Sequence, residues 1–255
     1  MSELVLPTKK SPPEIQSPAN IIIFSKPKVG KTELAAGLED CLILDFEKGS
    51  KYVECMAIEI DSIDKLTEVG QKIKEANFPY KYIVVDTVTA MEDMCITYAE
   101  KLYSQSPMGK NWFNKEDGGK KKYGNILNFP EGAGYNWLRL AFNNAMTFIK
   151  KLAPRVIFLG HVKDVLINKS GADFTASDLD LTGKIKRITA SNCDTIGYLY
   201  RKGNQNILSF KSSDEISCGA RPKHLRNQEI VISELINQGT PEEKVITHWD
   251  KIYID

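Results

Sequence analysis

The chain has 255 residues, 42% of them hydrophobic and 26% charged, which is enough to bury one sizeable α/β core. Its 34 basic and 33 acidic residues leave a net charge of +1, so any nucleic-acid site must come from a local basic patch. Five cysteines without a C-x-x-C pair argue against a disulfide framework and favour a reducing cytoplasm. The sequence shows no evident signal peptide and no apolar run of roughly 20 residues, so it predicts neither export nor a membrane span.

Residues 1–19 contain four prolines among polar residues and predict an extended or flexible arm. The apolar run Ile21 to Phe24 suits a buried strand, and a phosphate loop and a helix that ends before Asp40 follow it. Backbone N–H groups of such a loop cradle phosphates, its lysine binds the outer phosphates and its hydroxyl binds Mg²⁺. We therefore predict an ATP and Mg²⁺ site whose loop residues are Ser25, Lys26, Pro27, Lys28, Val29, Gly30, Lys31 and Thr32.

The loop departs from the consensus G-x-x-x-x-G-K-[ST] at its first position, where Ser25 replaces glycine. Glycine is the residue that best tolerates unusual backbone angles, so this substitution leaves the rate of turnover open more than binding. An ordinary helix start at Gly30, Lys31 and Thr32 is the alternative interpretation. The order of strand, loop and helix favours the phosphate loop.

Three more apolar runs, at 41–46, 82–86 and 156–160, are separated by stretches long enough for helical crossovers. This pattern predicts an α/β fold with a mainly parallel central sheet flanked by helices. A β-hairpin is expected at 196–210, and alternating patterns at 229–233 and 249–254 predict added strands. We therefore expect one domain over 20–255 with a β-rich C-terminal extension at about 196–255.

Two long segments resist regular assignment, residues 104–135 and 163–186. Loops of this length are usually functional or disordered. Both follow predicted strands of the sheet, and ligands of such sheets bind beyond the carboxyl ends of the strands. They are therefore suited to couple a second ligand to the triphosphate.

Acidic residues end two of the predicted strands, and a histidine ends a third. Asp86 is the candidate Mg²⁺ residue, with helix capping as the alternative. Glu47 is the candidate catalytic base; Asp45 is its rival but lies farther from the carboxyl end, and a solvated loop acid is the alternative. His161 is the candidate sensor of the γ-phosphate, with a hydrogen-bonded scaffold role as the alternative.

The order of elements resembles the RecA-type core ATPases and, more closely, the phage-encoded RecA-like proteins of single-strand annealing and recombination. The resemblance covers the chain from about residue 20 onward. It rests on the motifs Lys-Pro-Lys-Val-Gly-Lys-Thr at 26–32, Leu-Asp-Phe-Glu at 44–47, Val-Val-Asp-Thr at 84–87, Gly-His at 160–161 and Cys-Gly-Ala-Arg-Pro-Lys-His-Leu-Arg at 218–226.

The resemblance implies a RecA-like P-loop NTPase core in which Glu47 is the catalytic base, Lys31 a catalytic cation and His161 the γ-phosphate sensor, a position where the wider family often has glutamine. It also implies basic residues that reach the nucleotide of a neighbouring subunit, for which Lys184 and Lys186 are the candidates. A basic strand edge facing water is the alternative for these two lysines. The implied assembly is a homo-oligomeric ring or filament in the cytoplasm, of the host cell in the phage case.

Lysines and aromatic residues alternate within 104–135, a pattern that suits single-stranded DNA because cations track phosphates and aromatic rings stack on bases. A solvated lysine-rich loop is the alternative, since Glu116 and Asp117 dilute the charge. The candidate DNA-binding residues are Lys110, Trp112, Lys120, Lys121 and Lys122.

Three functions remain open on sequence alone. The first is a DNA-dependent ATPase of recombination, annealing or repair, with single-stranded DNA and a single-strand-binding protein as partners. The second is a small-molecule P-loop kinase, although no arginine-rich lid is evident. The third is a nucleotide-gated switch with little turnover.

Overall fold

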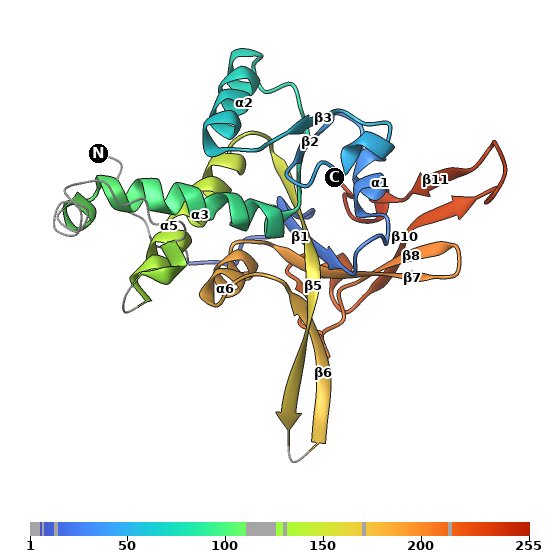
Figure 1. The fold of residues 1–255 in the computed structure, drawn as a ribbon. Helices are drawn as coiled ribbons and strands as arrows, with labels where there is room; N and C mark the ends of the chain where they lie inside the picture. The colour runs from blue at the N-terminus through green and yellow to red at the C-terminus, as the bar shows by residue number, and fades with distance from the viewer. Residues whose placement is uncertain are drawn as a thin grey trace.

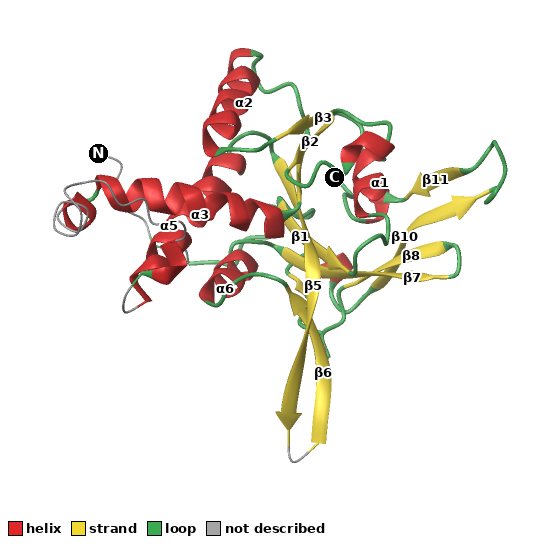
Figure 2. Cartoon of the chain, in the orientation of Figure 1, coloured by secondary structure: helices red, strands yellow, loops and turns green. Residues whose placement is uncertain are grey.

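The computed structural model describes residues 6, 8–12, 15–110, 126–129, 132–169, 172–213 and 216–255. An eleven-stranded mixed sheet forms its centre, with helices on both faces (Figures 1 and 2). Six mutually parallel strands make up the middle of the sheet. In spatial order they are β7 (Thr195–Lys202), β1 (Asn20–Ser25), β5 (Arg155–Lys169), β4 (Tyr82–Asp86), β2 (Cys41–Asp45) and β3 (Ala57–Glu59).

Antiparallel strands extend this core, most of them from the C-terminal part of the chain. Beyond β7 the sheet continues through β8 (Gln205–Ser209), β10 (Glu229–Ile236) and β11 (Lys244–Thr247), and the short β9 (Gly219–Ala220) pairs with β7. These strands confirm the predicted mainly parallel sheet with a C-terminal hairpin and added strands. β6 (Ala172–Leu179) pairs with the second half of β5, and the two project from the body as a ribbon (Figure 1).

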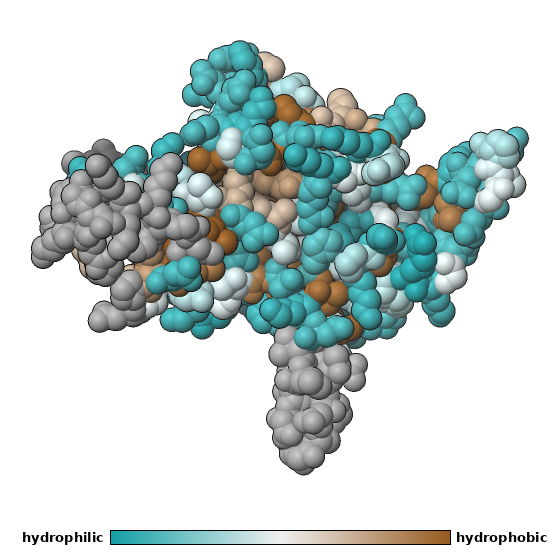
Figure 3. Space-filling model, viewed as in Figure 1, coloured by the Kyte–Doolittle hydropathy of each residue, from teal (hydrophilic) through white to brown (hydrophobic). Residues whose placement is uncertain are grey.

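Strands β1, β2 and β4 are buried on both faces, because alternate residues pack against different helices. Ile22 and Phe24 join a cluster with α2 (Ile63–Glu75), α3 (Val88–Gln105), α5 (Ala133–Ile149) and α6 (Lys184–Ser191). Ile21 and Ile23 face the other cluster, which contains α1 (Lys31–Ala36) and the C-terminal segment. The continuous apolar run of β1 is therefore the pattern of a strand covered on two sides. In the space-filling view, hydrophilic residues cover most of the described surface (Figure 3).

The C-terminal segment is part of this second cluster. Trp249, Ile252 and Tyr253 are buried over α1, and the Trp249 indole N–H donates to the Leu34 carbonyl at 2.9 Å. At the start of the chain Ser17 and Pro18 are buried, so the predicted arm packs on the core at its last residues. Its division from a single domain at 20–255 stays a prediction.

The prediction that residues 163–186 have no regular structure is wrong. The second half of β5, β6 and the first residues of α6 occupy it, because a two-stranded ribbon projecting from the helical layers tolerates polar composition. Lys184 and Lys186 therefore lie on a helix and not on a strand edge. Within 104–135 most of the described residues are helical: the end of α3, residues 107–110, the 3₁₀ turn η2 (Ile126–Asn128) and the start of α5.

The strand predicted at 249–254 is also wrong. Residues Trp249–Lys251 form a 3₁₀ turn, η5, because the apolar positions 249, 252 and 253 have helical spacing and point to one side. The nearby strand β11 was not predicted. Two further 3₁₀ turns are η1 (Ser50–Tyr52) and η4 (Lys223–Leu225). None of the helices in the described ranges has the length and apolarity needed to span a bilayer.

Candidate nucleotide-binding site

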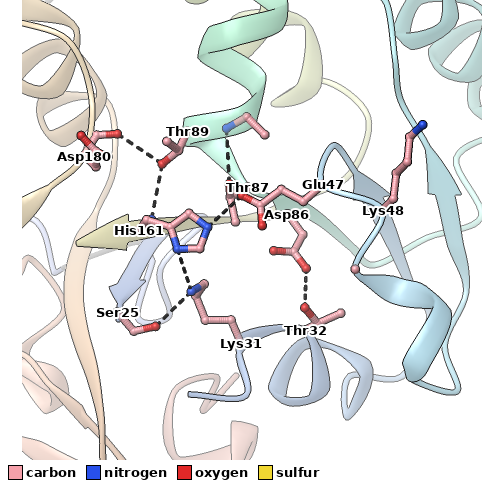
Figure 4. Close-up of polar contacts among 12 residues, drawn as sticks. Ser25, Lys31, Thr32, Glu47, Lys48, Asp86, Thr87, Thr89, His161 and Asp180 are labelled. Atoms are coloured by element: carbon pink, nitrogen blue, oxygen red, sulfur yellow. Dashed lines mark hydrogen bonds and ion pairs between the residues drawn. The ribbon is translucent and has the colours of Figure 1, made fainter. Parts of the chain in front are cut away.

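Strands β1, β2 and β4 end at one edge of the sheet, and β5 passes the same edge before it continues into the projecting ribbon. The prediction that His161 ends its strand is wrong, because β5 continues to Lys169. Ser25 ends β1 and is paired in register with His161 of β5, while Asp45 of β2 is paired with Asp86 of β4. Parallel pairing explains this convergence, since strands that run in one direction end at one edge. The predicted site residues of four separate sequence segments are thereby brought together (Figure 4).

The phosphate loop has left-handed backbone at two of its residues, Lys28 with φ of 63° and Gly30 with φ of 102°. Ser25 is not among the residues with positive φ; it is the last residue of β1, so glycine is not required there. The Ser25 hydroxyl donates to the Lys26 carbonyl at 2.8 Å and accepts from Lys31 Nζ at 3.1 Å. The serine at the first loop position is thus a partner of the loop lysine.

Lys31 is held inside the loop and is only 6% exposed. Besides Ser25, its Nζ contacts the Lys26 carbonyl at 3.5 Å and His161 Nδ1 at 3.4 Å (Figure 4). Burial lowers the pKa of Lys31, and the nearby carboxylates of Asp86 and Glu47 oppose that change. Its three partners among the described residues are neutral acceptors, which an anionic phosphate would replace with a stronger interaction.

Thr32 and Asp86 form the second half of the loop site. The Thr32 hydroxyl donates to Asp86 Oδ2 at 2.6 Å, and Asp86 is 4% exposed. Burial raises the pKa of Asp86, while the hydrogen bond from Thr32 opposes this rise. A hydroxyl and a carboxylate are the hard oxygen ligands that Mg²⁺ prefers, so the pair fits the ion. Over the described residues no group of three or more His, Cys, Asp or Glu side chains forms a complete metal site, so phosphate oxygens and water would supply the remaining ligands.

Asp45 has a different role from that of a base. Its buried carboxylate accepts from the backbone N–H groups of Glu47, Lys48, Gly49 and Ser50 at 2.7–3.3 Å and from the Ser50 hydroxyl at 2.5 Å. Burial raises the pKa of Asp45, but these hydrogen bonds outweigh it and hold the pKa below its ordinary value. Asp45 therefore shapes the loop after β2 and orients the acid two residues later.

Glu47 Oε1 accepts two hydrogen bonds, from the Thr87 hydroxyl at 2.5 Å and from His161 Nε2 at 2.8 Å (Figure 4). One tautomer of His161 satisfies both of its contacts: Nε2–H donates to Glu47, and bare Nδ1 accepts from the Lys31 ammonium. The imidazole thus bridges the loop lysine and the acid. Among the described residues no partner engages Glu47 Oε2, which is available to a water molecule.

A third group lies on the outer side of the phosphate loop and was missed in the sequence. Arg201 of β7 donates from NH2 to the Val29 carbonyl at 3.2 Å and from Nε to Asn206 Oδ1 at 3.4 Å. Asn206 in turn donates to Ser233 of β10 at 3.1 Å, and Asn206 and Ser233 are both buried. No local pattern signals this chain of contacts, because Arg201 and Val29 are 172 positions apart.

Tyr52 is a second residue without a sequence signal. It lies in η1, on the loop that Asp45 organises, and is 95% exposed. A fully exposed ring is unusual for tyrosine, which usually buries its apolar body.

The remaining candidates lie away from these residues or outside the described chain. Lys186 forms an ion pair with Asp178, and Lys184 has no ion-pair partner among the described residues. Lys110 is exposed shortly after the end of α3. The other DNA-binding candidates lie outside the described residues: Trp112, Lys120, Lys121 and Lys122.

A family model described as an AAA domain matches residues 17–221, which include the phosphate loop, Glu47, Asp86 and His161. The chain belongs to this AAA-domain family. The site of this AAA-domain protein is accordingly that of a P-loop nucleotide-binding ATPase. No curated protein sequence matches the chain.

Solved structures include similar folds at low sequence identity. A KaiC-like protein from the archaeon Pyrococcus horikoshii is 10% identical, with 90% of this chain and 89% of that chain covered at a TM-score of 0.42. The RadB recombinase is 11% identical, with 76% of this chain and 80% of that chain covered at a TM-score of 0.36.

Proposed function

We propose that this AAA-domain protein is a Mg²⁺-dependent ATPase of the RecA type that acts on single-stranded DNA in recombination, annealing or repair. One observation carries the ATPase part of this proposal: Glu47 and Lys31 both contact His161, beside the Thr32–Asp86 pair. A base, a phosphate-binding cation and a metal-binding oxygen pair therefore occur together at a single edge of the sheet.

In the proposed reaction, Thr32 and Asp86 would hold Mg²⁺, and the ion would supply positive charge at the phosphate oxygens of ATP. Lys31 leaves its neutral partners and donates to those oxygens. Glu47 Oε2 accepts a hydrogen bond from the attacking water and takes its proton as the water oxygen bonds to the γ-phosphorus and the bond to the ADP oxygen breaks. Products are ADP, phosphate and the proton that Glu47 returns to solvent.

His161 is proposed as the sensor of this reaction. When Lys31 moves to phosphate, His161 Nδ1 loses its donor, while Nε2 still donates to Glu47, the proposed base. The histidine lies on β5, and the same strand runs on into the projecting ribbon (Figure 1). A ligand that changes the position of the ribbon would therefore change the position of His161 and, through it, that of Glu47.

Single-stranded DNA is the proposed second ligand because the segment with Lys110, Trp112 and Lys120 to Lys122 combines cations with aromatic rings. The proposed assembly is a ring or filament of identical subunits. Lys184, which has no ion-pair partner among the described residues, is the candidate to reach a neighbouring nucleotide, whereas the ion pair of Lys186 with Asp178 would first have to break.

The deciding experiment measures phosphate release from ATP with Mg²⁺, with and without single-stranded DNA. Lys31→Ala and Glu47→Gln are expected to abolish release, while Lys72→Ala, a matched change on the exposed face of α2, leaves it unchanged. Glu47→Gln should still bind ATP, because the glutamine Oε1 accepts the same two hydrogen bonds. Release that DNA does not stimulate would remove the DNA part of the proposal, and release that survives both substitutions would remove the ATPase roles.

A nucleotide-gated switch with little turnover is the second candidate, and one contact favours it. The Ser25 hydroxyl holds Lys31 Nζ at 3.1 Å and therefore competes with phosphate for the lysine. If this contact slows turnover, Ser25→Gly should raise the rate of phosphate release at saturating ATP. An unchanged rate would show that the serine is not a brake.

A further inference from the structure

A cavity of about 420 Å³ opens at the edge of the sheet opposite the nucleotide site. It lies where β1 and β7 begin, between the end of the N-terminal arm, the segment around η4 and the C-terminus. We call it the amino-edge pocket and define it by Ile15, Pro18, Arg221, Lys223, Arg226 and Ile254. Part of its lining belongs to the motif at 218–226, which the ATPase mechanism does not use.

The walls of the amino-edge pocket are mainly aliphatic. Ile15 and Pro18 come from the arm, Pro222 from the start of η4, and Ile254 from the chain end. Ile15 is 72% exposed and Ile254 is 50% exposed, although both lie beside a hollow that could bury them. Backbone contacts hold this wall, since the Ile254 N–H donates to the buried Ser17 hydroxyl at 2.9 Å. Exposed apolar walls around a preformed cavity are typical of an interaction site.

The charge of the amino-edge pocket is unbalanced. Its lining contains three cationic side chains, Arg221, Lys223 and Arg226, and one acid, Asp194. Both oxygens of Asp194 are already engaged, by the Ala19 and Asn20 N–H groups and by Arg221.

Among the described residues, the two remaining cations have no acidic partner. Arg226 donates to the Arg221 carbonyl, and among the described residues neither Lys223 nor Arg226 forms an ion pair. Within the described ranges the rim therefore presents two cations without an ion pair, beside aliphatic walls.

Cations beside aliphatic walls favour some classes of ligand over others. Single-stranded nucleic acid would bring bases that need aromatic rings to stack on, and the described lining contains only the imidazole of His224, whose Nε2–H is committed to the Ile252 carbonyl at 3.0 Å. An acidic segment with aliphatic side chains would pair with the rim cations and pack against the aliphatic walls. We propose that the amino-edge pocket binds an extended acidic peptide of a partner protein, which inserts an aliphatic side chain between Ile15 and Ile254 and pairs its carboxylates with Lys223 and Arg226.

The test is fluorescence anisotropy with a fluorescein-labelled decapeptide of alternating glutamate and leucine, added to the full chain without nucleotide. The double variant Lys223→Glu/Arg226→Glu is expected to weaken binding about tenfold, the loss that corresponds to two rim ion pairs. Lys202→Glu/Lys244→Glu makes the same change of net charge on exposed residues elsewhere and should leave the affinity unchanged. Ile254→Ser should weaken binding without altering the rim charge.

Two probe peptides and an oligonucleotide separate the outcomes. A glutamate–serine peptide should bind weakly because it has no aliphatic anchor, and a lysine–leucine peptide should not bind because its charge is wrong. Equal affinity of the wild type and the rim variant for the glutamate–leucine peptide would overturn the proposal. So would a labelled oligothymidine that binds through Lys223 and Arg226 when the peptide does not, since that result would make the pocket a nucleic-acid surface. None of these measurements depends on ATP hydrolysis.

Discussion

Trp249 connects the C-terminal extension to the helix that follows the phosphate loop. Its indole is 7% exposed, stacks on Tyr253 at 6.0 Å between ring centroids and donates to the Leu34 carbonyl in α1. Because α1 begins with Lys31 and Thr32, this contact supports the residues that would bind phosphate and metal. We expect Trp249→Phe to destabilise the fold and to weaken ATP binding.

The magnitude follows from two losses. Removing the N–H donor costs about 0.5–1.5 kcal/mol net, at the ordinary value for one hydrogen bond, because the Leu34 carbonyl keeps the Gly37 N–H at 3.3 Å. The smaller ring leaves a cavity that costs about 1–2 kcal/mol, a fraction of the roughly 3–5 kcal/mol for truncation of a buried aromatic to alanine. The free energy of unfolding should therefore fall by about 1.5–3.5 kcal/mol. With an m-value of about 3 kcal/mol/M, the urea midpoint moves down by about 0.5–1.2 M.

Circular dichroism during urea titration measures this shift. Trp137→Phe is the matched control, because Trp137 is only half-buried on α5 and its indole N–H has no hydrogen-bond partner among the described residues. It should lower the midpoint less. A shift below about 0.2 M for Trp249→Phe, or an equal shift for both variants, would refute the claim that the indole hydrogen bond and its packing secure α1.

Three further outcomes are expected. Arg201→Ala should weaken ATP binding about tenfold, measured by titration with a fluorescent ATP analogue, because the Val29 carbonyl of the loop loses its donor, whereas Lys202→Ala should not. His161→Gln should retain more DNA-stimulated phosphate release than His161→Ala, because an amide donates to Glu47 and accepts from Lys31; equal rates would exclude the bridging role. Asp45→Asn should lower the free energy of unfolding at pH 7 by about 1–3 kcal/mol. Since the folded-state pKa of Asp45 is depressed, the wild type loses this stability as the pH falls below 3.8 through the folded pKa, and the denaturation curves of the two proteins should converge there.

Much of the candidate site could be predicted because its residues are tied to strand ends. Apolar runs fix Ser25 and Asp86 at the ends of their strands and His161 just after the apolar part of β5, and parallel pairing brings these positions to one edge whatever the strand order. The choice between Asp45 and Glu47 as the candidate base also follows from position along the strand. The structure explains why Asp45 is unsuited to act as the base: both of its carboxylate oxygens accept hydrogen bonds from backbone N–H groups of the loop that carries Glu47.

Local composition gave the wrong secondary structure for segments whose packing or pairing partner lies elsewhere in the fold. Residues 163–179 contain polar residues typical of a loop, yet β5 and β6 pair with each other over this stretch, and their pairing does not require a covered face. The apolar residues at 249, 252 and 253 fit a strand by composition and a helical turn by spacing. These residues form a turn because it lets all three side chains pack against α1.

The sequence alone determined the phosphate loop, the α/β class and the acids at the ends of β2 and β4, because these depend on patterns a few residues long. Only the tertiary structure decided that Arg201 contacts Val29, that Trp249 contacts Leu34, and that the chain ends enclose a pocket with η4. Arg201 and Val29 are 172 positions apart, and Trp249 and Leu34 are 215 apart. Such contacts depend on the spatial order of the strands, which no local pattern of side chains contains.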